Sequence, residues 1–298
     1  MTDGSLPRPH SRCILPQRIA CQAKPAGSKN GYILYDCSIC KHGYIYDSIS
    51  GKTLQEYYAD STKYSASSFA DDLAKQRFPG SRSDALRYLN VIRSFSNVPS
   101  PKMLEVGAGW GYASEAAAKI GWKTDAIEYS NDCIASLTKR LPSESQIYCG
   151  GFEEFIALNS GPYDAILMSQ VLEHALNPLQ WLASAHSILS DDGLLLVAVP
   201  LYKGFYRFMG LKDPFITPPE HLNFFTRKSL QSAALETGLV PLHAATYSRI
   251  PYWNIAKKLK VKPLSMAIYR ALQCAFWPLD KAGLSMMQVQ VFAKRVPE

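Results

Sequence analysis

The first chemical signal in this chain is a glycine-rich turn that follows an apolar run: Gly107, Gly109 and Gly111. Glycine permits positive φ and has no Cβ to keep a ligand away from the main chain. Open parallel sheets bind ligands where such turns lead from a strand into a helix. A P-loop would need a lysine here, and a dinucleotide-binding turn would have its third glycine where Tyr112 stands. Glu105, in the same stretch, would repel a pyrophosphate and attract an ammonium group.

A second carboxylate, Glu128, ends the next predicted strand, about 20 residues after the turn. A carboxylate at this place can accept hydrogen bonds from both hydroxyls of a ribose. The two acidic residues and the turn therefore favour a nucleoside without phosphates that has a cationic amino-acid tail. S-adenosylmethionine fits this description.

These residues need strands and helices to position them, and the hydrophobic pattern after residue 101 supplies both. Strands are predicted at 102–106, 123–128, 145–149, 163–169, 194–200, 240–247 and 286–295. Helices are predicted at 112–120, 131–141, 178–189 and 228–238. Continuous apolar strands that alternate with helices are typical of an α/β fold with a mainly parallel sheet covered on both faces. The last strand alternates valines with polar residues, as a late or edge strand would.

Over residues 82–294 the chain resembles the class I S-adenosylmethionine-dependent methyltransferases. LEVGAGWGY resembles their first motif, AIEYS their second, and YDAILMSQVLEHALNP the segment after their fourth strand. The resemblance implies a Rossmann-like sheet of seven strands with helices on both faces. It also implies a cofactor site formed by Glu105, Gly107, Ala108, Gly109, Gly111, Tyr112, Glu128, Tyr129, Phe152, Glu153 and Ser169.

The adenine end of this cofactor site departs from the family pattern. Related sequences often have an aspartate near Gly151, so we expect Phe152 and Glu153 to contact the adenine instead. The alternative is that Phe152 belongs to the core and that Glu153 is an acidic residue at a helix N-terminus.

Two histidines lie where methyl transfer would need a base. His174 follows the fourth strand, and His221 lies in EHLNFF, after the fifth strand. This second stretch resembles the active-site segment of sugar methyltransferases, and the resemblance implies that His221 is the general base and that Glu220 is a partner of the substrate or of the imidazole. His174 is the second catalytic candidate, and Ser169 is expected beside the methyl donor. A histidine hydrogen-bonded for structural reasons is the alternative.

Cys37 and Cys40 have the C-x2-C spacing with which two thiolates bind Zn²⁺. We expect the complete ligand set to be His10, Cys13, Cys37 and Cys40. Cys21 and His42 are rival ligands, and a knuckle of free thiols is the alternative to a metal site. The chain resembles sugar methyltransferases that have an N-terminal four-cysteine zinc module, although it lacks their first C-x2-C pair.

The expected division has a small N-terminal module, a helical lid or linker, and a methyltransferase domain with two insertions: 1–52, 53–100 and 101–298, with insertions near 201–225 and 250–286. Residues 1 to about 30 are predicted to be loop or a small appendage. The first insertion combines aromatic and basic side chains, which suit a ring-bearing or phosphorylated acceptor unless the rings pack on one another. The second is predicted to be a hydrophobic cap or dimer face, with a membrane-surface helix as the alternative.

Composition narrows the remaining choices. The chain has 298 residues, 47% of them hydrophobic, a net charge of +7 and seven cysteines. An odd number of scattered cysteines argues against a secreted disulfide framework, and neither a signal peptide nor an apolar run of about 18 residues is present. We therefore expect a cytoplasmic protein. Because the basic residues are dispersed, we expect no nucleic-acid partner.

The sequence thus predicts an enzyme that transfers a methyl group from S-adenosylmethionine to oxygen or carbon of a small sugar-like or other ring-bearing acceptor. A homodimer is compatible with the sequence, and a membrane-surface partner is not expected. The alternative function is a methyltransferase-like binding protein that has lost catalysis and supports a partner.

Overall fold

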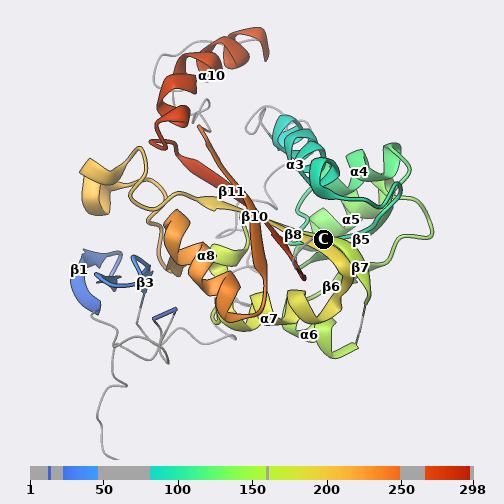
Figure 1. Cartoon of the computed structure of the whole chain (residues 1–298), viewed down its shortest axis with the longest axis horizontal. Helices are drawn as coiled ribbons and strands as arrows, with labels where there is room; N and C mark the ends of the chain where they lie inside the picture. The colour runs from blue at the N-terminus through green and yellow to red at the C-terminus, as the bar shows by residue number, and fades with distance from the viewer. Residues whose placement is uncertain (1–12, 15–22, 46–80, 159–160, 249–265, 296–298) are drawn as a thin grey trace, which may run out of the picture.

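The computed structural model describes residues 13–14, 23–45, 81–158, 161–248 and 266–295 (Figure 1). Its main element is a seven-stranded sheet in the order β10-β11-β8-β7-β4-β5-β6. The strands are β4 (Lys102–Val106), β5 (Lys123–Glu128), β6 (Ile147–Cys149), β7 (Tyr163–Ser169), β8 (Leu189–Pro200), β10 (Val240–Tyr247) and β11 (Met287–Ala293). Strands β4 to β8 pair in parallel, and β11 pairs antiparallel with both of its neighbours.

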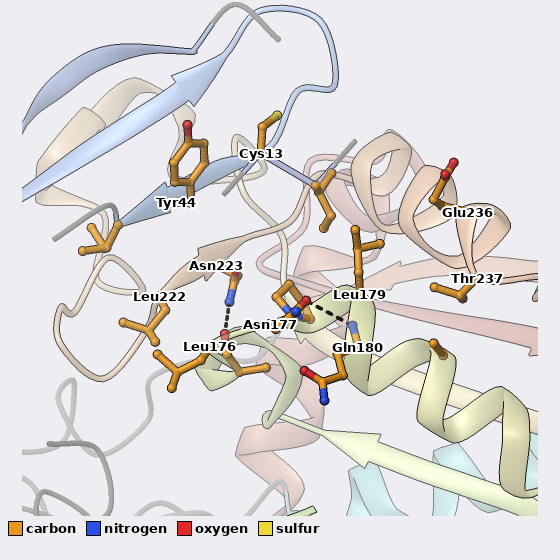
Figure 2. Close-up of a pocket in the computed structure, with 15 residues that line it drawn as sticks. Cys13, Tyr44, Leu176, Asn177, Leu179, Gln180, Leu222, Asn223, Glu236 and Thr237 are labelled. Atoms are coloured by element: carbon orange, nitrogen blue, oxygen red, sulfur yellow. Dashed lines mark hydrogen bonds between the residues drawn. The ribbon is translucent and has the colours of Figure 1, made fainter. Parts of the chain in front are cut away.

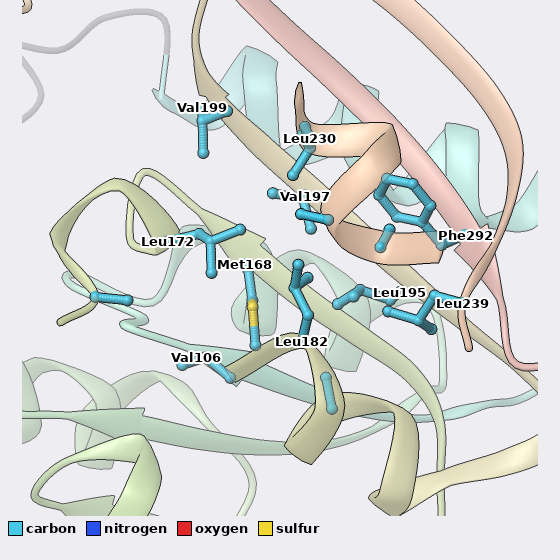
Figure 3. Close-up of a cluster of buried hydrophobic side chains, with 14 of the residues drawn as sticks. Val106, Met168, Leu172, Leu182, Leu195, Val197, Val199, Leu230, Leu239 and Phe292 are labelled. Atoms are coloured by element: carbon cyan, nitrogen blue, oxygen red, sulfur yellow. The ribbon is translucent and has the colours of Figure 1, made fainter. Parts of the chain in front are cut away.

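Helices cover both faces of this sheet: α3 (Ser81–Phe95), α4 (Tyr112–Lys119), α5 (Asn131–Arg140), α6 (Phe152–Leu158), α7 (Pro178–Ile188) and α8 (Arg227–Glu236). Helix α10 (Met266–Lys281) contacts β10 and projects beyond the sheet (Figure 1). Successive side chains of β8 point to opposite faces, as the period of a strand requires. Leu195 and Val197 pack with residues of α6, α7 and α8 (Figure 3), whereas Leu194 and Leu196 pack with residues of α3 and α4. The predicted α/β class and the Rossmann-like seven-stranded sheet with helices on both faces are confirmed.

Strand β11 is the last strand of the chain, as the first of the two expected alternatives has it, but it lies inside the sheet between β8 and β10, so the edge alternative is wrong. Its polar residues misled the prediction because they are buried and paired. The side-chain amide of Gln288 donates to Phe225 O at 2.8 Å, and that of Gln290 donates to Arg227 O at 3.1 Å. These bonds fasten the start of α8 to the sheet, and β10 forms the edge.

A second, four-stranded sheet contains the N-terminal cysteine segment: β1 (Ala23–Lys29), β2 (Tyr32–Cys37), β3 (Gly43–Ile45) and β9 (Asn223–Phe224). The two strands expected around Cys37 and Cys40 are present and pair antiparallel. Residues 23–29 are a strand, which corrects the expectation of loop up to about residue 30. The fourth strand, β9, comes from the EHLNFF stretch nearly 180 residues later and pairs with β3, with Tyr44 opposite Asn223.

Because β9 joins this sheet, the N-terminal segment is hydrogen-bonded to the methyltransferase-like body. The division into 1–52, 53–100 and 101–298 stays a prediction, and residues 46–80, which include much of the expected lid, lie outside the described residues. Among the helices that the structure describes, none combines the length and the apolar character needed to cross a bilayer.

Candidate cofactor and acceptor site

The glycine turn between β4 and α4 has the left-handed backbone that its composition predicts. The φ angles are 66° at Gly107, 53° at Gly109 and 77° at Gly111. A Cβ on Gly107 would lie 2.8 Å from Val171, and a Cβ on Gly111 would lie 2.5 Å from Leu137. A Cβ on Gly109 would meet no atom of the described residues within 4 Å. Gly109 is therefore the glycine whose missing side chain leaves room for a ligand, while the other two are required by packing.

Glu128 holds this turn in place from the end of β5. One of its carboxylate oxygens accepts a hydrogen bond from Gly109 N at 2.7 Å, and the other accepts from Tyr129 N at 2.8 Å and Ser130 N at 2.9 Å. Burial raises the pKa of Glu128, and the three hydrogen bonds counteract this shift. A carboxylate can accept about four hydrogen bonds, so this one retains capacity for a ribose hydroxyl.

A cavity of about 280 Å³ lies on the Glu128 side of the turn. Tyr129, Phe152, Glu153 and Trp181 line it, and the adenine contact expected of Phe152 and Glu153 stays a prediction. Phe152 is only 1% exposed and stacks edge-on against Trp181 with ring centroids 5.3 Å apart, so it also belongs to the core. The Trp181 indole N–H donates to the Glu153 carboxylate, which orients both side chains. Sequence reasoning missed Trp181 because it comes from α7, outside the recognised motifs.

A second cavity, of about 240 Å³, lies on the Glu105 side of the turn. Ala108, Tyr112 and Ser169 line it, and Gly107 and Gln170 line both cavities. Two adjoining cavities that share these residues fit a ligand with a nucleoside at one end and an amino-acid tail at the other.

Glu105 supplies negative charge to the second cavity. It is buried, and its carboxylate accepts from Ser114 N at 2.8 Å and from Ser114 Oγ at 2.5 Å. Burial raises the pKa of Glu105 to about 7, although the Ser114 bonds act in the opposite direction. Asp84 of α3 lines the same cavity and is also buried. The sequence signal for Asp84 was weak: it is an acidic residue in the first turn of an amphipathic helix.

The two candidate histidines lie together, with ring centroids 4.8 Å apart in an edge-to-face arrangement. His174 ends the short helix η2 (Leu172–His174) after β7, and its Nδ1 lies 2.7 Å from Glu220 O. His221 Nδ1 lies 2.6 Å from Phe215 O. Burial lowers the pKa of His174 to about 4 and that of His221 to about 3, so both rings are neutral at pH 7.

These contacts assign different roles to the two rings. When Nδ1–H of His221 donates to the Phe215 carbonyl, its Nε2 presents a lone pair, which is the form a general base needs. His174 meets the carbonyls of both Glu220 and Gln170, which makes it less available as a base. Glu220 contacts His174 through its main chain, and Phe215 O takes the place at His221 where we expected the Glu220 carboxylate.

Several rings of the insertion after β8 pack on the protein itself, whereas Phe208 is 85% exposed. Tyr206 contacts Phe215 at 5.9 Å between ring centroids, and Phe205 contacts Phe276 of α10 at 5.6 Å. Lys203 forms an ion pair with Asp36 of β2. These contacts support the alternative of a self-packed insertion over a row of rings that faces an acceptor.

Three of the cysteines form a separate buried cluster. The sulfur atoms of Cys13, Cys37 and Cys40 all lie within 4.8 Å of one another, and those of Cys13 and Cys40 are 3.0 Å apart. The turn after Cys40 is tight: Lys41 has φ 59°, and its N–H donates to Cys37 O at 3.0 Å.

The other proposed metal ligands are placed differently. His10 and Cys21 lie outside the described residues. His42 does not join the sulfur cluster, because its Nε2 faces Asn223 Oδ1 at 3.4 Å. The structure therefore argues against His42 as the rival fourth ligand.

Comparison with known proteins now identifies the fold family. Residues 73–244 match a family model described as a methyltransferase domain, which covers more than half of the chain. The chain belongs to this methyltransferase family. Its sheet order and flanking helices place the methyltransferase in class I, the S-adenosylmethionine-dependent fold class.

Solved structures share this fold at low sequence identity. The methyltransferase resembles an S-adenosylmethionine-dependent methyltransferase from Archaeoglobus fulgidus with a TM-score of 0.54 and 15% identity, over 74% of this chain and 98% of the other. It also resembles the 1,6-didemethyltoxoflavin-N1-methyltransferase of Burkholderia thailandensis with a TM-score of 0.54 and 14% identity, over 92% and 100% of the two chains. That structure contains 1,6-didemethyltoxoflavin and S-adenosylhomocysteine.

Curated relatives match over shorter segments. The methyltransferase is 29% identical over 101 residues to a ubiquinone biosynthesis O-methyltransferase from Caulobacter sp. strain K31, covering 33% of this chain and 40% of that protein. It is 29% identical over 113 residues to the protein of that name from Xanthomonas campestris strain B100, covering 37% and 47% of the two chains. The chain thus spans less than half the length of these two relatives.

Gly109 and Gly111 are predicted to respond differently to substitution, because one leaves space for a ligand and the other is required by packing. Gly109→Ala should fold but bind S-adenosylhomocysteine weakly, because the new Cβ would point into the space left for a ligand. Gly111→Ala should lower the melting temperature further, because its Cβ would lie 2.5 Å from Leu137 in addition to a backbone strain of roughly 1–2 kcal/mol that both variants share. Thermal melts and calorimetric titration measure the two effects. Equal loss of stability without a loss of affinity in Gly109→Ala would contradict this assignment.

The burial of Glu105 predicts a pH effect on cofactor binding. The ammonium group of the cofactor tail needs an ionised Glu105, whose pKa burial raises to about 7. The dissociation constant of S-adenosylhomocysteine should therefore fall as the pH rises from about 6 to about 8. Glu105→Gln should weaken binding by roughly 10- to 100-fold, since hydrogen bonds to charged groups contribute about 1.5–3 kcal/mol. It should also flatten the pH dependence, and an unchanged slope in calorimetry would exclude Glu105 as its source.

Proposed function

We propose that this methyltransferase uses S-adenosylmethionine to methylate oxygen or carbon of a small, ring-bearing and sugar-like acceptor, with His221 as the general base. The observation that carries the proposal is the meeting of two cavities at Gly107 and Gln170, next to the paired histidines. His174 lines the first cavity, and His221, which lines neither cavity, packs against His174 with ring centroids 4.8 Å apart. The cofactor would thus end within reach of a neutral imidazole.

The site residues fit S-adenosylmethionine. Gly109 leaves its surroundings open, Glu128 is a hydrogen-bond acceptor for a ribose, and Glu105 and Asp84 give the second cavity negative charge. The residues that line the two cavities, as far as the structure describes them, include no lysine or arginine to repel a sulfonium. When bound, the cofactor supplies an electrophilic methyl group.

The remaining task of the protein is to orient the acceptor and accept its proton. His221 would take that proton on Nε2 while its Nδ1–H stays bound to Phe215 O. Phe215 O thereby fixes the tautomer and stabilises the imidazolium that forms. His174 packs against His221 and holds the base in place from the other loop.

The class of acceptor is supported by related proteins and not by the insertion after β8. The names of the curated relatives refer to ubiquinone biosynthesis, and the Burkholderia structure contains a heterocyclic acceptor. Both point to a ring that carries a nucleophilic atom. The clustering of Glu105, Glu128 and the open glycine favours an active enzyme over a non-catalytic partner subunit. A cytoplasmic location, a homodimer and the absence of a nucleic-acid partner stay predictions.

Replacement of the base tests this function. His221→Ala should lower methyl transfer by about 100-fold or more, because a positioned base contributes that much, and should leave cofactor affinity unchanged. The pKa of His221, about 3 because of burial, predicts that protonation of this residue does not slow the wild-type enzyme between pH 8 and 6.

The measurement is formation of S-adenosylhomocysteine with a panel of nucleotide sugars, phenols and quinols. The matched control is His243→Ala, which alters a histidine on the edge strand β10. Near-wild-type turnover of His221→Ala on an accepted substrate would remove His221 from the mechanism.

We also propose that the chain belongs to the subgroup with an N-terminal cysteine-rich zinc module. The support is chemical: three buried thiols with their sulfur atoms within 4.8 Å suit a tetrahedral, thiolate-rich Zn²⁺ site. Cys13, Cys37 and Cys40 would hold the ion, and His10 is the proposed fourth ligand. The ion would have a structural role, because this cluster is distinct from the histidine pair.

Metal analysis tests the module. Protein purified without added zinc should contain about one Zn²⁺ per chain, because a structural site of this kind binds tightly. The Cys37→Ser/Cys40→Ser variant should lose the metal and melt at a lower temperature. Cys133→Ser alters a buried cysteine of α5 and should keep the zinc. Substoichiometric metal in the wild-type protein would refute the zinc site.

A further inference from the structure

The two loops that carry His174 and His221 are cross-linked by β9. The N–H of Leu222 donates to Glu173 O at 2.9 Å, and His174 Nδ1 reaches Glu220 O at 2.7 Å. The Asn223 side chain adds a third link, donating to Ala175 O at 2.6 Å. The carbonyls on both sides of His174 are thus bound by residues that directly follow His221.

Asn223 also faces the N-terminal sheet. Its Oδ1 lies 3.4 Å from Nε2 of His42, and its main chain pairs with Tyr44 of β3. The Asn223 side chain is only 7% exposed, so both ends of its amide meet protein groups in a desolvated place. Figure 2 shows Asn223 pointing at the loop before α7, with Cys13 and Tyr44 of the N-terminal segment on the other side.

Because Asn223 belongs to β9, its side chain connects the His174 loop to the N-terminal sheet. Strand β9 has two residues, and its neighbour in the sheet is β3, which directly follows the cysteine knuckle. Ile45 N also donates to Leu222 O at 2.9 Å, so the main chain next to His221 is bound to the N-terminal sheet on one side and to the His174 loop on the other. A shift of β3 would therefore move β9, and with it the edge-to-face contact between the two imidazoles.

We propose that Asn223 is a positioning residue that fixes the His174–His221 pair and couples its geometry to the N-terminal sheet through His42. This inference rests on the proposed role of His221 as the base. The N-terminal cysteine segment would then contribute to catalysis indirectly. It would hold β9, and with it His221, in position without contacting the reacting atoms.

Three single variants separate this role from general stability. Asn223→Ala removes the side-chain hydrogen bonds to Ala175 O and Glu173 O and the contact with His42. His42→Phe keeps an aromatic ring between Tyr44 and Phe225, which His42 contacts at 6.1 and 4.8 Å between centroids, but removes the nitrogen that meets Asn223. Asn177→Ala is the matched control, because it deletes a neighbouring asparagine that caps α7 through Gln180 N and contacts neither histidine.

In the activity assay, Asn223→Ala should lower kcat by roughly 10- to 100-fold, the loss expected when a catalytic group is displaced by about 1 Å. The dissociation constant of S-adenosylhomocysteine should rise by a much smaller factor than kcat falls, although His174 and Ala175 line the first cavity. His42→Phe should give a smaller loss of kcat, and Asn177→Ala should keep wild-type kcat although it melts at a lower temperature.

In the His221→Ala background, Asn223→Ala should cause no further loss of kcat, because it acts through His221. A full additional loss in the double variant, or an equal kcat loss in Asn177→Ala, would overturn the proposal.

NMR spectra of the histidine rings test the same proposal without an activity assay. In ¹⁵N-histidine-labelled protein, Asn223→Ala should shift the ring nitrogen resonances of His174 and His221 and leave those of His186 and His243 in place. Unchanged resonances of the pair would overturn the proposal. If the wild-type protein transfers a methyl group to no acceptor, the proposed function fails, and these spectra still decide whether Asn223 positions the pair.

Discussion

The carboxylate of Glu128 accepts three main-chain hydrogen bonds, and the shape of the cofactor turn depends on them. One bond reaches Gly109 in the turn after β4, and two reach the start of α5 after β5. A buried carboxylate is unfavourable unless its oxygens are paired, so the loops must stay in place around it. The parallel pairing of β4 with β5 brings Glu128 to the right level, because both strands end at the same edge of the sheet. If these three hydrogen bonds were lost, both Gly109 and the Glu128 carboxylate that would bind a ribose could leave their positions.

The sequence predicted those parts of the fold that follow local patterns. The strands were visible because apolar or alternating stretches recur between helical patterns, and the turn was visible because three glycines at every second position directly follow one of these strands. The glycines could not be assigned individual roles, because Val171 and Leu137 come from segments distant in the sequence. Gln288 and Gln290 misled the prediction for β11 for the same reason: their partners, Phe225 and Arg227, lie more than 60 residues away.

Two features had almost no local signal. Strand β9 has two residues, too few to show a period of two, so the link between the cysteine segment and the EHLNFF stretch was invisible. The insertion after β8 had the right residue types for an acceptor site, but composition cannot distinguish rings that face a ligand from rings that face one another. The proximity of His174 and His221 was anticipated only by resemblance. Its physical basis is the set of bonds from Leu222, Asn223 and Glu220 to the loop after β7.

Burial shifts the pKa of Glu105 and that of His221 in opposite directions, and each shift suits the role proposed for that residue. Removal from water disfavours charge of either sign, so burial raises the pKa of Glu105 to about 7 and lowers that of His221 to about 3. An incoming cation reverses the effect for Glu105, because it stabilises the ionised carboxylate. His221 has the Glu173 carboxylate within 4.8 Å of its ring, but burial keeps the imidazole neutral, so it retains the lone pair that proton transfer requires. Burial thus favours a cationic methyl donor at Glu105 and keeps His221 neutral as a base. Both effects require that the loops after β7 and β8 stay hydrogen-bonded to each other.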